Sequence, residues 1–301
     1  MKICIIGAGS IGLLLGSYFS EMGHDVYMFA RREEQVKALK DKGITRIMPN
    51  QQEVNVSVYA THDVKELPKN AWWFIAVKSH HLTQLTSLLN EVSPETKLVF
   101  VQNGLAHIKW LEKLQHIHSY IGTIEHGAMK QDSTTVLHKG FGVLNLAALE
   151  EDNQKYTEVF QSENVNFPIR SGFDAFTLVL RKTILNACIN PLTAILNVPN
   201  GGLIHDSYSF SLMKKIFEEI MDAFPEMRSH LLFTDVKKLC EKTAENRSSM
   251  LQDIQHGTKT EIDSIVGALI EQAAIRHKVL PTLQTLYTLV RAKEESGAKH
   301  A

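Results

Sequence analysis

Cysteine is scarce in this chain of 301 residues: only three occur, and no two of them stand at metal-ligand spacing. A disulfide framework and a cysteine-based zinc site are therefore excluded, and a reducing compartment, the cytoplasm, is favoured. Net charge is also small, because 32 Lys and Arg against 33 Asp and Glu leave −1. Binding of nucleic acid through bulk positive charge is therefore not expected.

Long apolar runs are missing as well. Beyond the N-terminus no stretch approaches the roughly 18 apolar residues of a membrane-spanning helix, so no membrane segment is expected. The first twenty residues resemble a signal peptide, but glycines at positions 7, 9 and 12 interrupt the apolar run and a strand pattern follows it. We interpret them as part of the folded protein. With 44% apolar and 22% charged residues, the composition is typical of a soluble globular chain of one large or two ordinary domains.

The first half of the chain alternates strand patterns with helix patterns. Helical spacing covers residues 10–23, and the polar helix at 32–43 stops at a glycine. Short apolar runs that indicate strands lie at 2–7, 25–31, 71–77, 97–104, 117–125, 134–140 and 141–149. This order predicts a parallel sheet with right-handed crossovers, to which antiparallel strands are added late.

After about residue 168 the periodicity becomes helical. Helices are predicted at 173–190, 206–223, 234–246 and 260–278, and a last one begins at Pro281. We expect Thr260 and Asp263 to form a capping box, and Pro191 to bend or end its helix at Asn190. The predicted fold is an α/β Rossmann-type N-terminal domain, residues 1–167, followed by an all-α C-terminal domain, residues 168–301.

A glycine-rich turn connects the first strand to the first helix. Gly7, Gly9 and Gly12 have the G-x-G-x-x-G spacing of dinucleotide-binding proteins. The first glycine makes the tight turn, the second admits a pyrophosphate, and the third brings the helix close to the strand. The alternative is a tight turn that binds nothing. The predicted cofactor-binding turn consists of Gly7, Ala8, Gly9, Ser10, Ile11 and Gly12.

The end of the second strand indicates which nicotinamide cofactor is bound. An NAD site places Asp or Glu there to accept hydrogen bonds from the ribose, whereas this chain has Ala30, Arg31 and Arg32. A guanidinium binds a 2′-phosphate through charge and paired hydrogen bonds. We therefore predict NADP as the cofactor, with Arg31 as its main contact. The alternative is a solvated pair of charges that opens the next helix.

Two more polar residues follow predicted strands directly. Lys78 comes after the third strand, in AVKSHH, and Asn103 comes after the fourth, in VQNG. In open parallel sheets ligands bind at the carboxyl ends of the strands, so both are candidate ligand contacts. The alternative for each is an ordinary polar turn residue.

A polar stripe runs along an otherwise apolar helix. Lys182, Asn186 and Asn190 recur every four residues and share one face over roughly 12 Å. On a buried helix an ammonium and two amides need partners, which a polar ligand or an interhelical hydrogen-bond network would supply. A shielded lysine can polarise a ketone and then protonate the alkoxide. Cys188, on the same helix, is interpreted as a core residue rather than a nucleophile.

Taken together, these motifs resemble the ketopantoate reductases over nearly the whole chain. The resemblance rests on GAGSIG, Arg31, AVKSHH, VQNG and two long blocks, RKTILNACINPLTAILNVPNG and SSMLQDIQHGTKTEIDSIVGALI. It implies NADPH-dependent reduction of ketopantoate to pantoate on the route to pantothenate and coenzyme A. It also implies a Rossmann domain and a helical domain with the site in the cleft between them.

The resemblance assigns roles to individual residues. Lys182 matches the catalytic lysine, and Glu261 matches a catalytic glutamate that also lies near the cofactor. The other implied contacts are Lys78 and Ala128 with the cofactor, Asn103 with cofactor and substrate, and Asn186, Asn190, Asn200 and Ser249 with the substrate. Two of these have alternatives, since Ser249 with Gln252 can form a capping box and Glu261 can be a helix-dipole partner.

Some questions stay open at this stage. The chain departs from the family at Ser79, His80 and His81 and near Lys259, which leaves cofactor affinity undecided. No metal site is predicted, because the 14 histidines are scattered. The alternative functions are reduction of another 2-keto acid and dinucleotide sensing without chemistry. The apolar helical half forms either a homodimer interface or simply a core.

Overall fold

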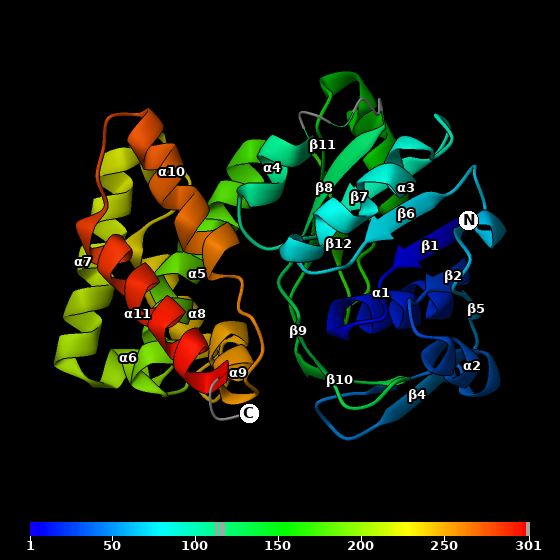
Figure 1. Ribbon diagram of the computed structural model, residues 1–301, viewed down its shortest axis with the longest axis horizontal. Coiled ribbons are helices and arrows are strands. Elements are labelled where there is room, and N and C mark those ends of the chain that lie inside the picture. The colour runs from blue at the N-terminus through cyan, green and yellow to red at the C-terminus, as the bar shows by residue number, and fades with distance from the viewer. Residues whose placement is uncertain (112–113, 115–117, 299–301) are drawn as a thin grey trace. The chain divides into compact units, whose positions relative to one another are not determined.

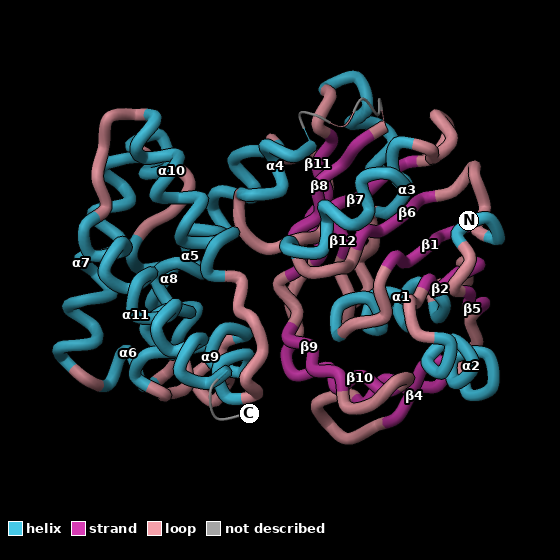
Figure 2. The backbone as a smooth tube through the Cα atoms, viewed as in Figure 1, coloured by secondary structure: helices cyan, strands magenta, loops and turns pink. Residues whose placement is uncertain are grey.

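The computed structural model describes residues 1–111, 114 and 118–298. Contacts between residues divide the chain into two compact units. The strand unit comprises Met1–Gln102 and Glu112–Leu178, and the helical unit comprises Asn103–Leu111 and Val179–Ala301. Strands occur in the first unit and helices make up the second, as Figures 1 and 2 show. The segment that directly follows the strand at residues 97–100 therefore belongs with helices far away in sequence.

The main sheet of the strand unit has eight strands and is mostly parallel. In spatial order they are β12 (Ile169–Arg170), β11 (Leu144–Ala148), β8 (Ser119–Ile124), β7 (Lys97–Phe100), β6 (Trp72–Ile75), β1 (Lys2–Ile6), β2 (Asp25–Phe29) and β5 (Tyr59–Thr61). β11 runs antiparallel to β8, with Leu144 opposite Ile124. The predicted parallel sheet with a late antiparallel strand is confirmed. Residue 117, the start of one predicted strand, lies outside the described residues.

The strand order reverses next to β1. The chain proceeds from β1 to β2 and β5 on one side, then returns through β6 to β7 and β8 on the other. Ile3 pairs with Val26 on one side and with Trp72 on the other, both in parallel register. Ligands of such sheets bind at the carboxyl ends of the strands where the order reverses, which here is the end of β1 that carries the glycine turn.

A second sheet of four strands was not predicted. Its order is β4 (Glu53–Val56), β3 (Ile44–Ile47), β10 (Thr135–Gly140) and β9 (Gly127–Lys130). Helix α1 (Ser10–Glu21) packs against β1 and β2 of the main sheet and against β3, β9 and β10 of the second sheet. Its long apolar run, which includes Leu13, Leu14 and Leu15, is buried by both sheets. The segment 134–140, expected as a further strand of one sheet, is a strand of the second.

The other helices of the strand unit are short. They are α2 (Glu33–Lys42) and α3 (Thr86–Asn90), with 3-10 turns at Val64–Glu66, Ser79–Leu85 and Glu151–Phe160. Gly43, at φ +69°, ends α2 as predicted. No larger residue fits at this position, because an added Cβ would lie 2.1 Å from the Val56 carbonyl oxygen.

The helices of the helical unit are α4 (Ala106–Leu111), α5 (Ala175–Leu196), α6 (Gly202–His205), α7 (Ser207–Ala223), α8 (Phe233–Lys242), α9 (Ser249–Gln255), α10 (Ala268–Ile275) and α11 (Pro281–Ala298), with a 3-10 turn at Pro225–Ser229 and a π-helical turn at Asp263–Gly267. The five predicted helices are present with changed bounds, as α5, α7, α8, α10 and α11, whereas the three short helices α4, α6 and α9 were not predicted. The first residues of α5 belong to the strand unit, so the chain passes from one unit to the other within this helix. Among the described residues, no helix has the length and apolar character to cross a membrane.

Of the two outcomes predicted for Pro191, a bend or an end of its helix at Asn190, the end is wrong. α5 continues to Leu196 with Pro191 inside it. Leu192 and Ala194 on the following turn are buried, and this burial offsets the backbone hydrogen bond that proline cannot donate.

The expected capping box of Thr260 with Asp263 is also wrong. The Thr260 amide donates instead to Glu294 Oε1 of α11 at 2.7 Å, and Asp263 accepts a hydrogen bond from Tyr287 at 2.8 Å. The Thr260 amide and the Asp263 carboxylate thus have partners on α11, while the Thr260 hydroxyl accepts locally from the Ile262 amide at 3.1 Å.

Candidate active site

The glycine turn after β1 has the backbone geometry that its spacing predicts. Gly7 adopts φ +112°, and an added Cβ would lie 2.9 Å from Val77 Cγ1. At Gly12 an added Cβ would lie 1.8 Å from the Gly7 carbonyl oxygen, so α1 approaches the turn as closely as only glycine allows. At Gly9, by contrast, no atom lies within 4 Å of the Cβ position. Two glycines are therefore required by the protein's own packing, and the middle one leaves open space.

The start of α1 has no side-chain cap. Gly9 is its N-cap residue, and the Ser10 hydroxyl accepts a hydrogen bond from the Lys130 amide at 3.0 Å. The first-turn N–H groups of α1 thus have no side-chain partner, which suits an anion. Ile11 packs on the core. The Ala8 carbonyl oxygen accepts hydrogen bonds from Gln35 Nε2 at 2.9 Å and from Lys130 Nζ at 3.0 Å.

Neither Gln35 nor Lys130 was among the predicted site residues. Both reach the glycine turn from other elements, Gln35 from α2 and Lys130 from β9. Nothing in the local sequence marks them, although Lys130 stands two residues after Ala128, which the family resemblance names. Ala128 itself lies on β9 opposite His138 and packs against the core.

Two of the predicted cofactor residues at strand ends, Arg31 and Lys78, lie in the strand unit. Arg31 is exposed and follows β2, and Arg32 is the N-cap residue of α2. Lys78 follows β6, is half-buried, and begins the 3-10 turn that carries His80 and His81. Gln102, which was not predicted, donates hydrogen bonds to the carbonyl oxygens of Ile75 at 2.6 Å and of Val77 at 3.0 Å. This amide fixes the backbone that leads into Lys78.

Asn103 and Glu261 meet within the helical unit. Asn103 Nδ2 donates a hydrogen bond to Glu261 Oε2 at 2.8 Å. Beside it, the Leu105 amide donates to the Ser264 carbonyl oxygen at 2.8 Å. Gly104 adopts φ +83°, and an added Cβ would lie 2.0 Å from the same oxygen. The loop after β7 therefore lies directly against the π-helical turn.

The backbone around Glu261 is held from several sides. Its carbonyl oxygen accepts hydrogen bonds from the Ser264 hydroxyl and the Ile265 amide, both at 3.0 Å. The preceding amide, that of Thr260, is bound by Glu294 of α11. Glu261 stands just before a π-helical turn, a feature that is frequent at functional sites. Its carboxylate is thus presented by backbone that local hydrogen bonds and the contact with Glu294 hold together.

Lys182 lies on α5, half-buried, and has a buried histidine as neighbour. His107, on α4, is 1% exposed. Burial lowers the pKa of His107 to about 4; the Gly104 backbone opposes this shift, and the positive charge of Lys182 adds to it. The imidazole is therefore neutral at physiological pH. Nothing in the sequence marks His107, because only the fold brings it near Lys182.

The rest of the polar stripe follows α5. Asn186 is half-buried and Asn190 is 7% exposed. The Thr193 hydroxyl donates to the Asn190 carbonyl oxygen at 2.9 Å and lies 2.7 Å from the Ser248 hydroxyl. Cys188 is fully buried, which raises its thiol pKa, so its interpretation as a core residue is confirmed.

Helix α9 does not begin with the capping box of Ser249 and Gln252 that was the alternative interpretation of Ser249. The N-cap residue is Ser248, whose hydroxyl accepts from the Leu251 amide at 3.1 Å, so a capping box of Ser249 with Gln252 is wrong. Ser249 is the first helical residue and is exposed. Asn200 lies in a turn, as predicted, where its Nδ2 donates to Thr243 Oγ1 at 2.9 Å.

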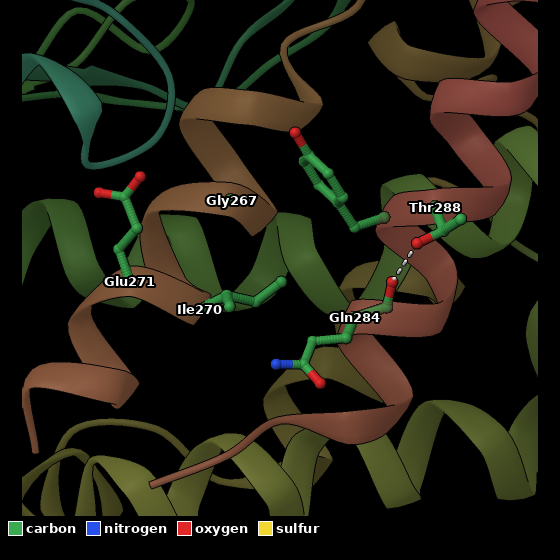
Figure 3. Close-up of a pocket in the computed structure, with 6 residues that line it drawn as sticks. Gly267, Ile270, Glu271, Gln284 and Thr288 are labelled. Carbon is green, nitrogen blue, oxygen red and sulfur yellow. Dashed lines mark hydrogen bonds between the residues drawn. The ribbon is translucent and has the colours of Figure 1, made fainter. Parts of the chain in front are cut away.

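Three further features of the described residues bear on chemistry: metal-ligand clusters, the cysteines and a hollow between two helices. None of them includes a predicted site residue. Residues 1–111, 114 and 118–298 contain no group of three or more histidine, cysteine and acidic side chains placed to hold a metal ion. Three cysteines in this range are free and buried. A hollow between α10 and α11 is lined by Gly267, Ile270, Glu271, Gln284, Tyr287 and Thr288 (Figure 3).

Comparison with known proteins matches both halves of the chain to one family. The family model described as "Ketopantoate reductase PanE/ApbA" matches residues 3–151, and the one described as "Ketopantoate reductase PanE/ApbA C terminal" matches residues 174–294. The 2-dehydropantoate 2-reductase of Bacillus subtilis (strain 168) is 35% identical over 301 residues, which cover 99% of each chain. That of Listeria monocytogenes is 34% identical over 298 residues, covering 98% of this chain and 97% of its own.

Solved structures agree with these matches. The probable 2-dehydropantoate 2-reductase from Bacillus subtilis superposes with a TM-score of 0.82 at 34% identity, over 97% of this chain and 100% of the other. D-mandelate dehydrogenase, solved with NADH and anilino(oxo)acetate, shares the fold with a TM-score of 0.85 at 24% identity, over 99% of each chain.

Fold and matches together define the class of protein: an oxidoreductase with a Rossmann-type unit followed by a helical unit. More particularly, the chain belongs to the ketopantoate reductase family.

Proposed function

We propose that this protein reduces ketopantoate (2-dehydropantoate) to (R)-pantoate with NADPH, in the cytoplasm, on the route to pantothenate and coenzyme A. The full-length likeness to proteins named 2-dehydropantoate 2-reductase supports this substrate. The observation that carries the chemistry is the hydrogen bond between Asn103 and Glu261 in the same unit as Lys182. Of these three residues we assign contact with the reacting carbonyl to Lys182, and the orientation of Lys182 and the substrate to Glu261 and Asn103.

The residues around the glycine turn fit a dinucleotide. The open space at Gly9 and the uncapped start of α1 suit a pyrophosphate. Arg31 follows β2 where an NAD site would have a carboxylate, so the 2′-phosphate of NADPH is the favoured ligand there. Lys78, Asn103, Ala128 and Glu261 are the remaining proposed contacts. When bound, the reduced nicotinamide supplies the hydride that adds to the C2 carbonyl.

The side chains of the helical unit bind and orient the keto acid. Ser249 is exposed at the first position of α9, and its hydroxyl donates a hydrogen bond to the substrate carboxylate. Asn186 and Asn190 on α5, together with Asn200, contact its other polar groups. Asn190 and the start of α9 are tied to each other through Thr193 and Ser248, so these contacts are held in a fixed relation. Such pre-positioning lowers the entropic part of the barrier.

Lys182 supplies the proton. As the C2 carbonyl is reduced, its oxygen becomes an alkoxide, and the Lys182 ammonium gives this oxygen a proton to form the alcohol of pantoate. The neutral amine then regains a proton from solvent. Before the transfer the ammonium polarises the carbonyl. Glu261 orients Lys182 and the substrate, and Asn103 fixes the Glu261 carboxylate.

Oxidation of NADPH in the presence of ketopantoate tests the proposal directly. The protein is assayed with a panel of 2-keto acids, and ketopantoate is expected to give the highest kcat/KM. Faster turnover of another acid would support the second candidate, a reductase of a related 2-keto acid, which the shared fold of D-mandelate dehydrogenase favours. Absence of NADPH oxidation with every acid would instead point to a dinucleotide-sensing protein.

A further inference from the structure

Lys130 is a positive charge at the glycine turn to which no role has been given. It ends β9 of the second sheet, 120 residues from Ser10 along the chain. Its amide donates to the Ser10 hydroxyl and its ammonium donates to the Ala8 carbonyl oxygen, each at 3.0 Å. An ammonium has three N–H donors, and among the described residues Ala8 is its one hydrogen-bond acceptor.

The surroundings of Lys130 place it on the α2 side of the glycine turn. Gln35 of α2 donates to the same Ala8 oxygen at 2.9 Å and to the Ser133 carbonyl oxygen at 2.8 Å. α2 begins just after Arg32, and Arg31 precedes it at the end of β2. The glycine turn, the start of α2 and the turn between β9 and β10 therefore meet at one place.

Charges of both signs lie at this place, because the first turn of α2 also carries Glu33 and Glu34. The pKa of Lys130 is lowered by burial and then by the nearby positive charge of Arg32, while Asp132 acts in the opposite direction. Asp132 is occupied elsewhere, because its Oδ1 accepts hydrogen bonds from the Thr134 amide at 2.8 Å and the Thr135 amide at 2.7 Å. Two cations held close together repel each other, and a bound dianion removes that repulsion.

We propose that Lys130 binds the 2′-phosphate of NADPH together with the arginines at the end of β2, and so sets the preference for NADPH over NADH. A phosphate monoester is a dianion near neutral pH and accepts several hydrogen bonds, which matches an ammonium with donors to spare. The inference rests on the proposed function, because it assumes that the glycine turn holds a nicotinamide dinucleotide. It adds a specificity residue from the second sheet.

The test measures binding rather than turnover. Isothermal titration calorimetry of the wild-type protein, Lys130→Gln, Lys130→Arg and Lys139→Gln is run with NADPH, NADH and adenosine 2′,5′-bisphosphate. Glutamine keeps an N–H donor but carries no charge, so the first variant removes the positive charge while retaining a donor. Lys139 is exposed on the adjacent strand β10 and serves as the matched control.

For Lys130→Gln we expect NADPH and adenosine 2′,5′-bisphosphate to bind about tenfold more weakly, with NADH changed less than about twofold. Lys130→Arg and Lys139→Gln should bind all three like the wild type. Unchanged NADPH affinity in Lys130→Gln, or an equal loss for NADPH and NADH, would overturn the proposal. Thermal unfolding without ligand checks that each variant folds. A wild-type protein that binds neither dinucleotide would overturn the proposed function itself, which separates the two failures.

Discussion

Asn103 donates a 2.8 Å hydrogen bond to Glu261, although 158 residues separate them in the chain. Asn103 follows Gln102, the last residue of the first segment of the strand unit, whereas Glu261 precedes a π-helical turn of the helical unit. The loop that a Rossmann sheet would use for its ligand is thus packed onto the helices. In the proposed mechanism this gives the cofactor loop and the catalytic carboxylate a common support.

Replacing Asn103 by aspartate is expected to disrupt this pair. Two carboxylates at hydrogen-bond distance cannot both be ionised without mutual repulsion. We expect Asn103→Asp to lower the unfolding free energy by about 1–3 kcal/mol at neutral pH and to reduce kcat/KM for ketopantoate at least tenfold. Denaturant titration and steady-state kinetics measure the two effects.

The double variant Asn103→Asp with Glu261→Gln reverses the donor and the acceptor, so it should recover stability without recovering activity. Asn50→Asp is the matched control, because Asn50 is exposed and its side-chain oxygen accepts a hydrogen bond that aspartate can also accept. A double variant as unstable as Asn103→Asp would show that the hydrogen bond is not what stabilises the wild type.

Gly104→Ala tests how closely the loop lies against the π-helical turn. An added Cβ would lie 2.0 Å from the Ser264 carbonyl oxygen at φ +83°, so the backbone must move. We expect a loss of at least about 3 kcal/mol in unfolding free energy. Gly257→Ala is the control: φ is +63° there, but no atom lies within 4 Å, so a loss of only about 1 kcal/mol is expected. Equal losses in the two variants would mean that the close approach contributes nothing.

Gly9→Ala should separate folding from cofactor binding. The Cβ position of Gly9 has no atom within 4 Å and φ is −85°, so alanine fits the structure. The methyl group would occupy the space assigned to the pyrophosphate. We therefore expect an unfolding midpoint like that of the wild type, with NADPH bound at least about tenfold more weakly in calorimetry. Unchanged affinity would remove the pyrophosphate from this position.

Lys182→Ala should abolish most turnover while leaving cofactor binding intact. General acid catalysis typically contributes about 10²- to 10⁴-fold, so kcat for ketopantoate should fall by at least a hundredfold. NADPH affinity, measured by calorimetry, should stay close to that of the wild type. Lys215→Ala, an exposed lysine on α7, is the control and should turn over normally. Normal turnover in Lys182→Ala would show that another group supplies the proton.

Stability should fall in mild acid because a histidine is buried in its neutral form. His138 is 1% exposed; its Nδ1 lies 2.9 Å from the Tyr18 hydroxyl and its Nε2 lies 3.0 Å from His126 Nδ1. Burial, aided by the positive charge of Arg46, lowers the pKa of His138 to about 4, while the Gly140 backbone acts the other way. The unfolded chain therefore takes up this proton at higher pH than the folded protein does.

The stabilisation from neutral His138 is complete above about pH 6.5 and is lost as the pH falls towards 4, by up to about 3 kcal/mol. Urea unfolding at about pH 7 and about pH 5 measures it. In His138→Gln the difference between the two pH values should shrink, even if the variant is less stable at both. An unchanged pH difference in the variant would assign the effect to other groups, such as His107.

Local patterns in the sequence were sufficient for much of the fold. Strands buried on both faces appear as short apolar runs, so β1, β2, β6 and β7 were located within a few residues. The second sheet was not foreseen as a sheet, because β3 and β4 are four-residue strands whose alternation is too short to stand out. The continuation of α5 past Pro191 depended on burial of the following turn, which no local rule for proline contains.

For the candidate site, the sequence by itself determined the glycine spacing, the arginine after β2 and the stripe of Lys182, Asn186 and Asn190, because each depends on a repeat or a neighbour within a few residues. Only the tertiary structure decided that Asn103 pairs with Glu261, that His107 lies near Lys182 and that Lys130 reaches the glycine turn. Those relations join segments that are distant in the chain. They depend on how side chains pack and backbone polar groups find hydrogen-bond partners across the whole fold. The local periodicity of the sequence contains no information about these long-range contacts.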